Sequence, residues 1–473
     1  MVVGSSPLTS MTAGQPSIGR TEGEGLPILF IAMEFPPVNT TGVFRSLTFA
    51  KYLPDYGVKP IVLTLDTSDG SEIFGAEVDT ELGSDLPPNI EVIRISCAAR
   101  QSRQTSRLRK FIRIYFSLED DIARRWRSEI WRRAPALIMR YRPRAVYVSL
   151  PPFSAGRLAV ELAQRFRLPL IVDMRDGWSS WRVGPFGSWL HYRLVVRRER
   201  AIFKAAASVV TVTRQLAAVL GRVHENIPFS RIQVVTNGYD NELKLPAKID
   251  VPLRAAESSI IIGYVGSFYY EPEQRRAQFT PWWKKRFHRK LQYSAIREDW
   301  LYRSPFFFLR ALAQLFERRP EFRRRVKFEV MGTNSPWLGE MAAEFGLQDN
   351  CAFHARCSHA NVIQFQKRCN AFLCTSVKVP DGEDYAIASK TFEYLREAKP
   401  ILGFVTRGAQ RDFLIESGLA LISDPDDTEG GSRVLEQLVI GDFRLTPNAT
   451  FLARFHRREL AGELAAIVKR VAV

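Results

Sequence analysis

Short continuous apolar runs of strand length recur along this chain, and a polar or glycine-bearing loop and then a helical pattern follow most of them. The first run covers residues 26–33, its loop covers 34–42, and apolar residues recur at helical spacing over 43–56. The next run covers residues 60–65. Continuous apolar strands are typical of parallel sheets, which helices cover on both faces. The order of strand, loop, helix and strand therefore predicts the opening of a doubly wound α/β sheet.

The same unit recurs through both halves of the chain. A length of 473 residues is too great for one ordinary core, so two series of strands indicate two Rossmann-like domains that face each other across a cleft. We expect a disordered leader, an N-terminal acceptor domain, a linker, a C-terminal nucleotide-binding domain and a terminal helix that returns toward the first domain. Their predicted bounds are 1–25, 26–240, 241–258, 259–451 and 452–473.

The charge requires an anionic partner. There are 67 Lys and Arg residues against 50 Asp and Glu residues, which gives a net charge of +17. Nucleic acid, anionic lipid and phosphorylated substrates all meet this requirement. Two segments, 98–144 and an apparent insertion at 269–304, combine basic with aromatic residues. We interpret 98–144 as an amphipathic helix that lies on an anionic membrane surface, and the alternative is a solvated basic helix that packs by its aromatic side.

The expected compartment is the cytoplasm, with peripheral contact at the inner face of the membrane. The five cysteines are odd in number and thinly scattered, which argues against a disulfide framework. No apolar run reaches the length of about 18 residues that a spanning helix needs. Cys351, His354, Cys357 and His359 lie close in sequence, but no second ligand pair follows at zinc-finger spacing, so we predict no metal site.

Polar residues after the first-half strands are candidates for a binding site. Gly42 lies in the loop after the first strand, and Arg45 begins the next helix, where it could reach an anionic group. Asp173, Arg175 and Asp176 end a buried strand. Arginine cannot act as a general base, but it can hold a phosphate or an acceptor while an aspartate orders a sugar. The alternative is a structural Asp–Arg ion pair that closes a loop.

The second half offers a phosphate-binding turn and a helix start. Gly266 and Ser267 follow the strand at 260–265, where backbone N–H groups can cradle a phosphate, although an ordinary tight turn is the alternative. Lys390 and Glu393 are three residues apart and share one face of a helix. The basic residues that could neutralise a diphosphate are harder to assign, and the candidates are Arg275, Arg276, Lys284 and Lys285.

Five motifs occur in order over most of the chain. They are MEFPPVNTTGVFR at 33–45, the pair VSLPP and DMRDGW at 148–152 and 173–178, VVTNGYD at 234–240, YVGSF at 264–268 and SKTFEYLREAKPIL at 389–402. Together they resemble the family 4 glycosyltransferases of the GT-B fold, in the branch of bacterial polysaccharide biosynthesis.

The resemblance implies a retaining hexosyltransferase-like enzyme that uses a nucleotide-diphosphate sugar as donor substrate and no cofactor. The implied acceptor is a lipid-linked or polysaccharide chain, and no nucleic-acid partner is expected. Glu393 would accept hydrogen bonds from the ribose hydroxyls, and Lys390 would hold phosphate oxygens. The predicted catalytic residues are Asp173, Arg175, Asp176 and Lys390. The predicted donor-binding residues are Gly42, Arg45, Gly266, Ser267, Glu383, Lys390 and Glu393.

Two positions depart from the family pattern. Tyr385 stands where many members carry a second glutamate, and Glu383 or Asp384 could substitute for it. Arg175 and Asp176 stand where many members carry a His-Asp pair. Three other hypotheses therefore stay open: a sugar-nucleotide epimerase, a non-catalytic scaffold of the same fold, and a basic nucleic-acid-binding protein.

Overall fold

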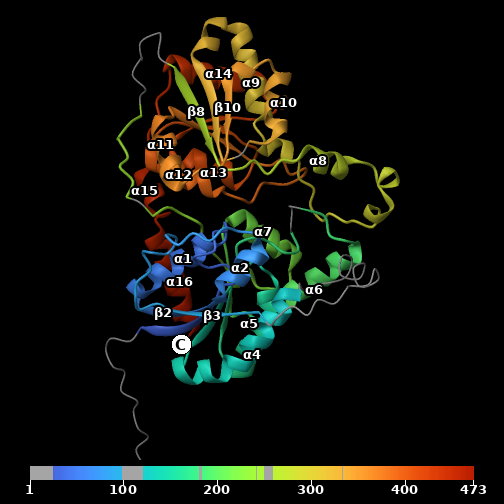
Figure 1. The fold of residues 1–473 in the computed structure, drawn as a ribbon, viewed down its shortest axis with the longest axis vertical. Coiled ribbons are helices and arrows are strands. Elements are labelled where there is room, and N and C mark those ends of the chain that lie inside the picture. The colour runs from blue at the N-terminus through green and yellow to red at the C-terminus, as the bar shows by residue number, and fades with distance from the viewer. Residues whose placement is uncertain are drawn as a thin grey trace, which may run out of the picture.

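The chain folds into two α/β domains, one above the other in Figure 1. This computed structural model describes residues 25–97, 121–180, 184–240, 242–249, 259–332 and 334–472. The predicted leader lies outside the described residues except for Gly25, and so do residues 241 and 250–258 of the predicted linker and residues 98–120 of the first basic segment.

The N-terminal domain is built on a seven-stranded parallel sheet in the order β3-β2-β1-β4-β5-β6-β7. Its strands are β1 (Leu26–Ile31), β2 (Val58–Leu65), β3 (Glu91–Ile95), β4 (Ala145–Leu150), β5 (Leu170–Met174), β6 (Ser208–Thr211) and β7 (Ile232–Val234). Its helices are α1 (Val43–Tyr52), α2 (Thr67–Phe74), α4 (Asp121–Tyr141), α5 (Ser154–Phe166), α6 (Trp189–Ala205) and α7 (Arg214–Val223).

The C-terminal domain repeats this plan with a six-stranded parallel sheet in the order β10-β9-β8-β11-β12-β13. Its strands are β8 (Ile260–Val265), β9 (Val326–Met331), β10 (Cys351–His354), β11 (Ala371–Thr375), β12 (Ile401–Phe404) and β13 (Ala420–Ser423). Its helices are α8 (Pro272–Phe279), α9 (Phe306–Arg318), α10 (Pro336–Glu344), α11 (His359–Arg368), α12 (Ser389–Tyr394), α13 (Ala409–Ser417), α14 (Thr428–Ile440) and α15 (Ala449–Ala453). The predicted fold of two Rossmann-like domains is confirmed.

The topology fixes where ligands can bind. In each sheet the strand order reverses beside the first strand, between β1 and β4 in one domain and between β8 and β11 in the other. Open parallel sheets bind ligands outside the carboxyl ends of their strands at such a switch point. The loops that follow β1, β4, β5 and β8 therefore carry the residues of interest.

The last helix, α16 (Arg457–Val471), packs on the N-terminal domain rather than on the domain that precedes it in sequence. Leu460, Leu464 and Val468 are buried in one cluster with Phe30 and Phe49 of the first domain. Figure 1 shows this helix, in red, among the blue elements of that domain. A second chain crossing therefore joins the domains.

The described part of the first basic segment does not present an aromatic face to solvent, so our membrane interpretation of it is wrong there. In α4, Trp126 is 1% exposed and its indole N–H donates to the carbonyl of Ile95 at 3.1 Å. The indole N–H of Trp131 donates to Glu161 at 3.2 Å. The helix thus packs by its aromatic side. This arrangement removes the apolar surface of the indole rings from water and gives each indole N–H group a hydrogen-bond acceptor. No helix within the described ranges has the length and apolarity to span a bilayer.

The insertion at 269–304 projects from the C-terminal domain on the right of Figure 1. It holds α8 and three short 3-10 helices, Trp282–Lys284, Phe287–Arg289 and Trp300–Arg303. Two backbone hydrogen bonds between Phe186 and Tyr293, of 2.8 and 3.0 Å, tie it to the N-terminal domain. The insertion is therefore also a bridge between the domains.

Candidate functional site

Arg45 and Asp173 form a buried ion pair inside the N-terminal domain. The Arg45 Nε and Nη2 atoms donate to the Asp173 carboxylate at 2.7 and 2.9 Å, and Tyr147 donates to the same carboxylate at 2.5 Å. The remaining N–H groups of Arg45 go to the carbonyls of Val235 and Thr236 and to the side chain of Asn237.

This pair corrects two of our site predictions. Asp173 is 0% exposed and Arg45 is 6% exposed, so neither reaches a ligand in this structure. Charges removed from water are stable only when they are paired and hydrogen-bonded, and these two satisfy each other. The structural ion pair that we had kept as an alternative exists, but it joins Asp173 to Arg45. It ties the start of α1 to the ends of β5 and β7.

Arg175 lies at the rim of the same sheet. Its Nη2 atom donates to Glu34 at 2.8 Å and also to the carbonyl of Pro151. A Cβ atom on Gly42 would lie 1.8 Å from Arg175 Nη1, so the loop after β1 passes directly against this guanidinium and a larger residue there would displace the arginine. Gly42 and Arg175, predicted separately, are therefore in contact, and Glu34, which sequence reasoning missed, orients the arginine.

Asp176 follows directly and faces the other domain. Burial raises the pKa of its carboxyl group, Arg175 and Arg303 lower that pKa, and Glu34 raises it. Arg303 belongs to the C-terminal domain, so Asp176 lies where the two domains meet. Within the described residues its carboxylate makes no hydrogen bond or ion pair. It is the N-terminal carboxylate best placed to accept a hydrogen bond from a ligand.

Two glycines follow neighbouring strands of the C-terminal domain at their carboxyl ends. Gly266 after β8 has φ of +91°, and Gly332 after β9 has φ of +120°. A Cβ on Gly332 would lie 3.0 Å from the Gly266 Cα, and a Cβ on Gly266 would lie 3.4 Å from Lys390 Nζ. Side chains are excluded at both positions, so backbone at the ends of β8 and β9 stays open beside a lysine.

Lys390 is the second residue of α12, and its Nζ lies beside Gly266. Its Nζ lies 3.7 Å from the centroid of the Tyr264 ring, a cation–π contact. Burial lowers the pKa of Lys390 to about 7, Cys374 and Glu393 oppose that shift, and Arg303 adds to it. No carboxylate pairs with its ammonium group in the described residues. A lysine in this state gains its full charge when an anion binds beside it.

Arg303 is a basic residue of the site that sequence reasoning missed. Its guanidinium lies over the rings of Tyr269 and Trp300, at 5.7 and 5.4 Å, and the pKa values of both Lys390 and Asp176 respond to its charge. Among the described residues it donates no side-chain hydrogen bond. The signal in the sequence was its position three residues before α9. Without the insertion, the loop that joins β8 to α9 would end there.

The four basic residues that we had named for the diphosphate lie elsewhere. Arg275 is held by Asp299 through two hydrogen bonds of 2.7 Å. Arg276 and Lys284 are exposed, and Lys285 is half-buried in the insertion. None of the four influences the pKa of Lys390 or Asp176. Arg303, whose charge acts on both pKa values, therefore replaces them as the candidate.

The carboxylates of the C-terminal domain divide between the surface and the interior. Glu393 is exposed on α12, one turn from Lys390, and Glu383 is also exposed. Asp384 is buried and accepts hydrogen bonds from the backbone of Val377 and Ala386, at 3.3 and 3.0 Å. Asp384 thus shapes its own loop, and Glu393 is free to meet a ligand.

Tyr385 joins the two domains. Its side chain is 6% exposed and packs in the apolar cluster of the N-terminal domain. Its carbonyl accepts a hydrogen bond of 2.6 Å from Thr213 at the start of α7. A second cross-domain bond, 2.7 Å long, runs from Gln215 to Asp412. A residue that departs from the family pattern thus forms part of the domain contact.

The site therefore combines Arg175 and Asp176 from one domain with Arg303, Lys390, Glu393, Gly266 and Ser267 from the other. Two cations beside an open backbone turn can hold a diphosphate, and a nearby carboxylate can bind a diol. Arg175 and Asp176 face them across the domain boundary, where a second substrate would lie.

Comparison with known proteins bears on the fold. Residues 45–238 match the model of the glycosyl transferase 4-like domain. No curated protein matches the sequence significantly. Similar solved structures include sucrose-phosphate synthase from Thermosynechococcus elongatus, with 14% identity and a TM-score of 0.55 over 94% of this chain and 98% of that chain.

HepE from Anabaena, solved in complex with UDP, has 12% identity and a TM-score of 0.56 over 94% of this chain and 99% of that chain. The lipopolysaccharide outer core galactosyltransferase WaaB has 12% identity and a TM-score of 0.53 over 94% and 99% of the two chains. At these identities the likeness establishes the fold alone. The chain therefore has the GT-B fold, and its residues 45–238 match the glycosyl transferase 4-like domain.

Proposed function

We propose that this protein transfers a sugar, with retention, from a nucleotide-diphosphate sugar to a lipid-linked or polysaccharide acceptor at the inner face of the membrane. One observation carries the donor assignment: Lys390 and Arg303 lie close enough to couple electrostatically, beside the open turn at Gly266 and Gly332. Two neighbouring cations repel each other unless an anion lies between them. A diphosphate supplies that anion.

The donor would lie along the C-terminal sheet edge. Its diphosphate would accept hydrogen bonds from backbone N–H groups near Gly266 and Ser267. Its negative charge would be neutralised by Lys390 and Arg303. Glu393, exposed one helical turn from Lys390, would accept hydrogen bonds from the two ribose hydroxyls. HepE, a structural neighbour, binds UDP, which makes a uridine nucleotide the first ligand to try.

The bond from the anomeric carbon to the diphosphate breaks as negative charge develops on the leaving oxygen. The two cations stabilise that charge in a partly buried site, which lowers the barrier to transfer. Asp176 and Arg175 would orient the acceptor from the opposite domain. Closure of the domains would exclude water and limit hydrolysis of the donor. Retention of the anomeric configuration is the outcome that the family resemblance implies.

A transfer assay tests the proposal. The protein is incubated with a panel of nucleotide sugars and with lipid-diphosphate or oligosaccharide acceptors, and nucleotide release and product mass are followed. We expect one donor to react, the product to keep the anomeric configuration by NMR, and Lys390→Met to lose transfer. Donor binding without release or transfer would favour the non-catalytic scaffold, for which the position of Tyr385 in the domain contact is the motivating observation. Epimerised donor without transfer would favour the epimerase.

A further inference from the structure

The insertion exposes large apolar side chains that no other part of the described chain covers. Trp282, Trp283 and Phe287 are 66%, 62% and 90% exposed, and Phe279 and Leu291 are also exposed. Phe279 ends α8, and Trp282 and Trp283 lie on the first short 3-10 helix; neither element buries any of its residues. Phe287 begins the next short 3-10 helix. Exposed apolar patches of this kind are typical of protein or membrane contacts.

The same segment is strongly cationic. Six basic residues and no acidic residue occur between 277 and 297: Lys284, Lys285, Arg286, Arg289, Lys290 and Arg297. None of the six forms an ion pair within the described residues. Burial lowers the pKa of Lys285, and Arg297 and Arg289 lower it further. The positive charge is thus unneutralised and crowded, and its partner must be anionic.

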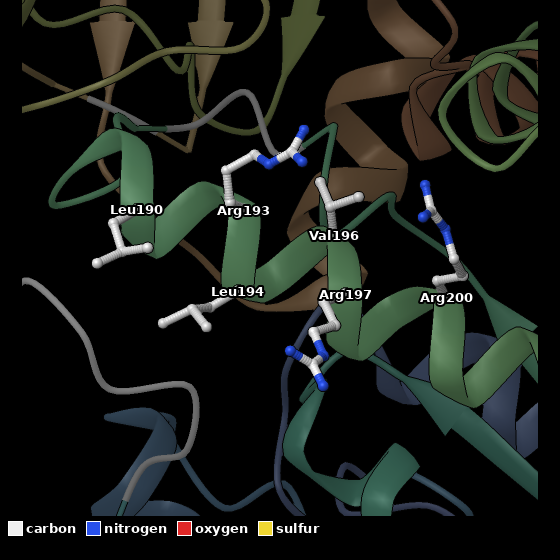
Figure 2. A pocket seen from close by; sticks show the side chains of 6 residues that line it. All are labelled: Leu190, Arg193, Leu194, Val196, Arg197 and Arg200. Atoms are coloured by element: carbon white, nitrogen blue, oxygen red, sulfur yellow. The ribbon is translucent and has the colours of Figure 1, made fainter.

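Helix α6 continues this surface on the N-terminal domain. Trp189 and Leu190 are 57% and 47% exposed. Leu190 and Leu194 project to one side of the helix (Figure 2), and they line a hollow of about 330 Å³ together with Arg193, Arg197 and Arg200. Contacts between Tyr293 of the insertion and the Phe186–Tyr192 stretch join the two parts: the Phe186 backbone pair and a ring contact of 5.0 Å with Tyr192. Figure 1 shows α6 and the insertion on the same side of the molecule.

We propose that residues 279–297, with the start of α6, dock this protein on an anionic phospholipid bilayer. The inference rests on the proposed function, because it names the surface that would bring the enzyme to a lipid-linked acceptor. Tryptophan and phenylalanine enter the headgroup region while lysine and arginine meet anionic lipids, which is how interfacial segments bind.

The observations favour lipid over nucleic acid. The rings of Trp282 and Trp283 stand at 88° to each other, so in this arrangement they do not offer parallel faces to successive bases. The apolar set includes the aliphatic Leu190, Leu194 and Leu291, which a bilayer accepts and base stacking does not use. The insertion begins at Tyr269, and Trp300 lies near its end. These are the two rings under Arg303, so the docked surface adjoins the proposed donor site.

Vesicle co-sedimentation of the full chain tests the proposal. The probes are vesicles of phosphatidylcholine alone and of phosphatidylcholine mixed with phosphatidylglycerol. We expect binding to the anionic vesicles only. Each basic residue near an anionic surface strengthens binding about five-fold, so Lys284→Glu with Arg286→Glu should weaken it by about 25-fold or more. Trp282→Ser with Phe287→Ser should weaken binding with no change in charge.

The matched control is Arg132→Glu with Arg133→Glu, an equal charge change on exposed residues of α4, and we expect vesicle binding within about two-fold of wild type, since this helix buries its aromatic side. The proposal is overturned if the wild type ignores anionic vesicles, if the α4 pair matters as much as the insertion pair, or if the insertion residues bind DNA or a second copy instead. Thermal stabilisation by UDP, measured on every variant, separates a failure of docking from a failure of the proposed function.

Discussion

The pKa of Lys390 predicts that a nucleoside diphosphate binds more weakly as the pH rises above neutrality. Burial holds this pKa at about 7 in the ligand-free protein. A diphosphate beside the ammonium group restores the pKa toward its ordinary range, because an opposite charge favours the protonated form. At a pH above 7 the free protein must therefore take up a proton in order to bind.

The size of the effect follows from the titration. If only protonated Lys390 binds the diphosphate, the dissociation constant scales with the inverse of the protonated fraction. Between a pH of about 7 and about 8.5 that fraction falls about 15-fold, and the affinity falls by the same factor. The terminal phosphate of the ligand, with a pKa near about 6, is already mostly ionised in this window, so its titration works against the trend only weakly.

Isothermal titration calorimetry with UDP measures this directly. Buffers of different ionisation enthalpy give the number of protons taken up, which should approach one at the upper end of the window. Lys390→Arg is the control, because a guanidinium stays protonated throughout and should give an affinity that does not depend on pH. An unchanged affinity in the wild type, or the same pH dependence in Lys390→Arg, would refute the assignment of Lys390 to the phosphates.

Other variants test the remaining geometry. Asp173→Asn leaves the Arg45 guanidinium buried without a counter-charge, and we expect urea denaturation to show a loss of about 3–5 kcal/mol in the free energy of unfolding. Arg303→Met removes a charged hydrogen-bond donor, so UDP should bind about 10- to 100-fold more weakly by calorimetry while the melting temperature without ligand holds. Tyr385→Ala removes a buried side chain from the domain contact, which should cost about 3 kcal/mol. Small-angle scattering should then report a larger radius of gyration. An unchanged radius would show that this contact does not hold the two domains together.

Much of the fold could be predicted because buried parallel strands are continuous apolar runs. The runs at 26–33, 260–265 and 326–331 became β1, β8 and β9 within two residues. Strand β3 (Glu91–Ile95) was missed, because it lies at the sheet edge and its five residues mix charged with apolar side chains. Tertiary pairing with β2, rather than its own sequence, makes that segment a strand.

The site was predictable where one short motif carries it, and not where distant residues pair. Gly266 follows β8, and Lys390 lies in the first turn of α12, which follows β11. The two residues come together because β8 and β11 are neighbours at the switch point of one sheet. The pairing of Arg45 with Asp173 spans 128 residues, and nothing in either motif shows that these charges neutralise each other. Arg303 was hidden because a long insertion separates it from the turn that it serves.

Thermal stabilisation by a panel of nucleotides and nucleotide sugars, on the wild type and on Glu393→Ala, tests the central claim most directly. At a ligand concentration of about 100 times the dissociation constant, binding to the folded state adds roughly 2.7 kcal/mol. We predict that at least one nucleotide-diphosphate sugar raises the melting temperature and that Glu393→Ala loses the effect. If no nucleotide or nucleotide sugar shifts the melting temperature of the wild type, this site does not hold a sugar donor and the proposed transfer is wrong.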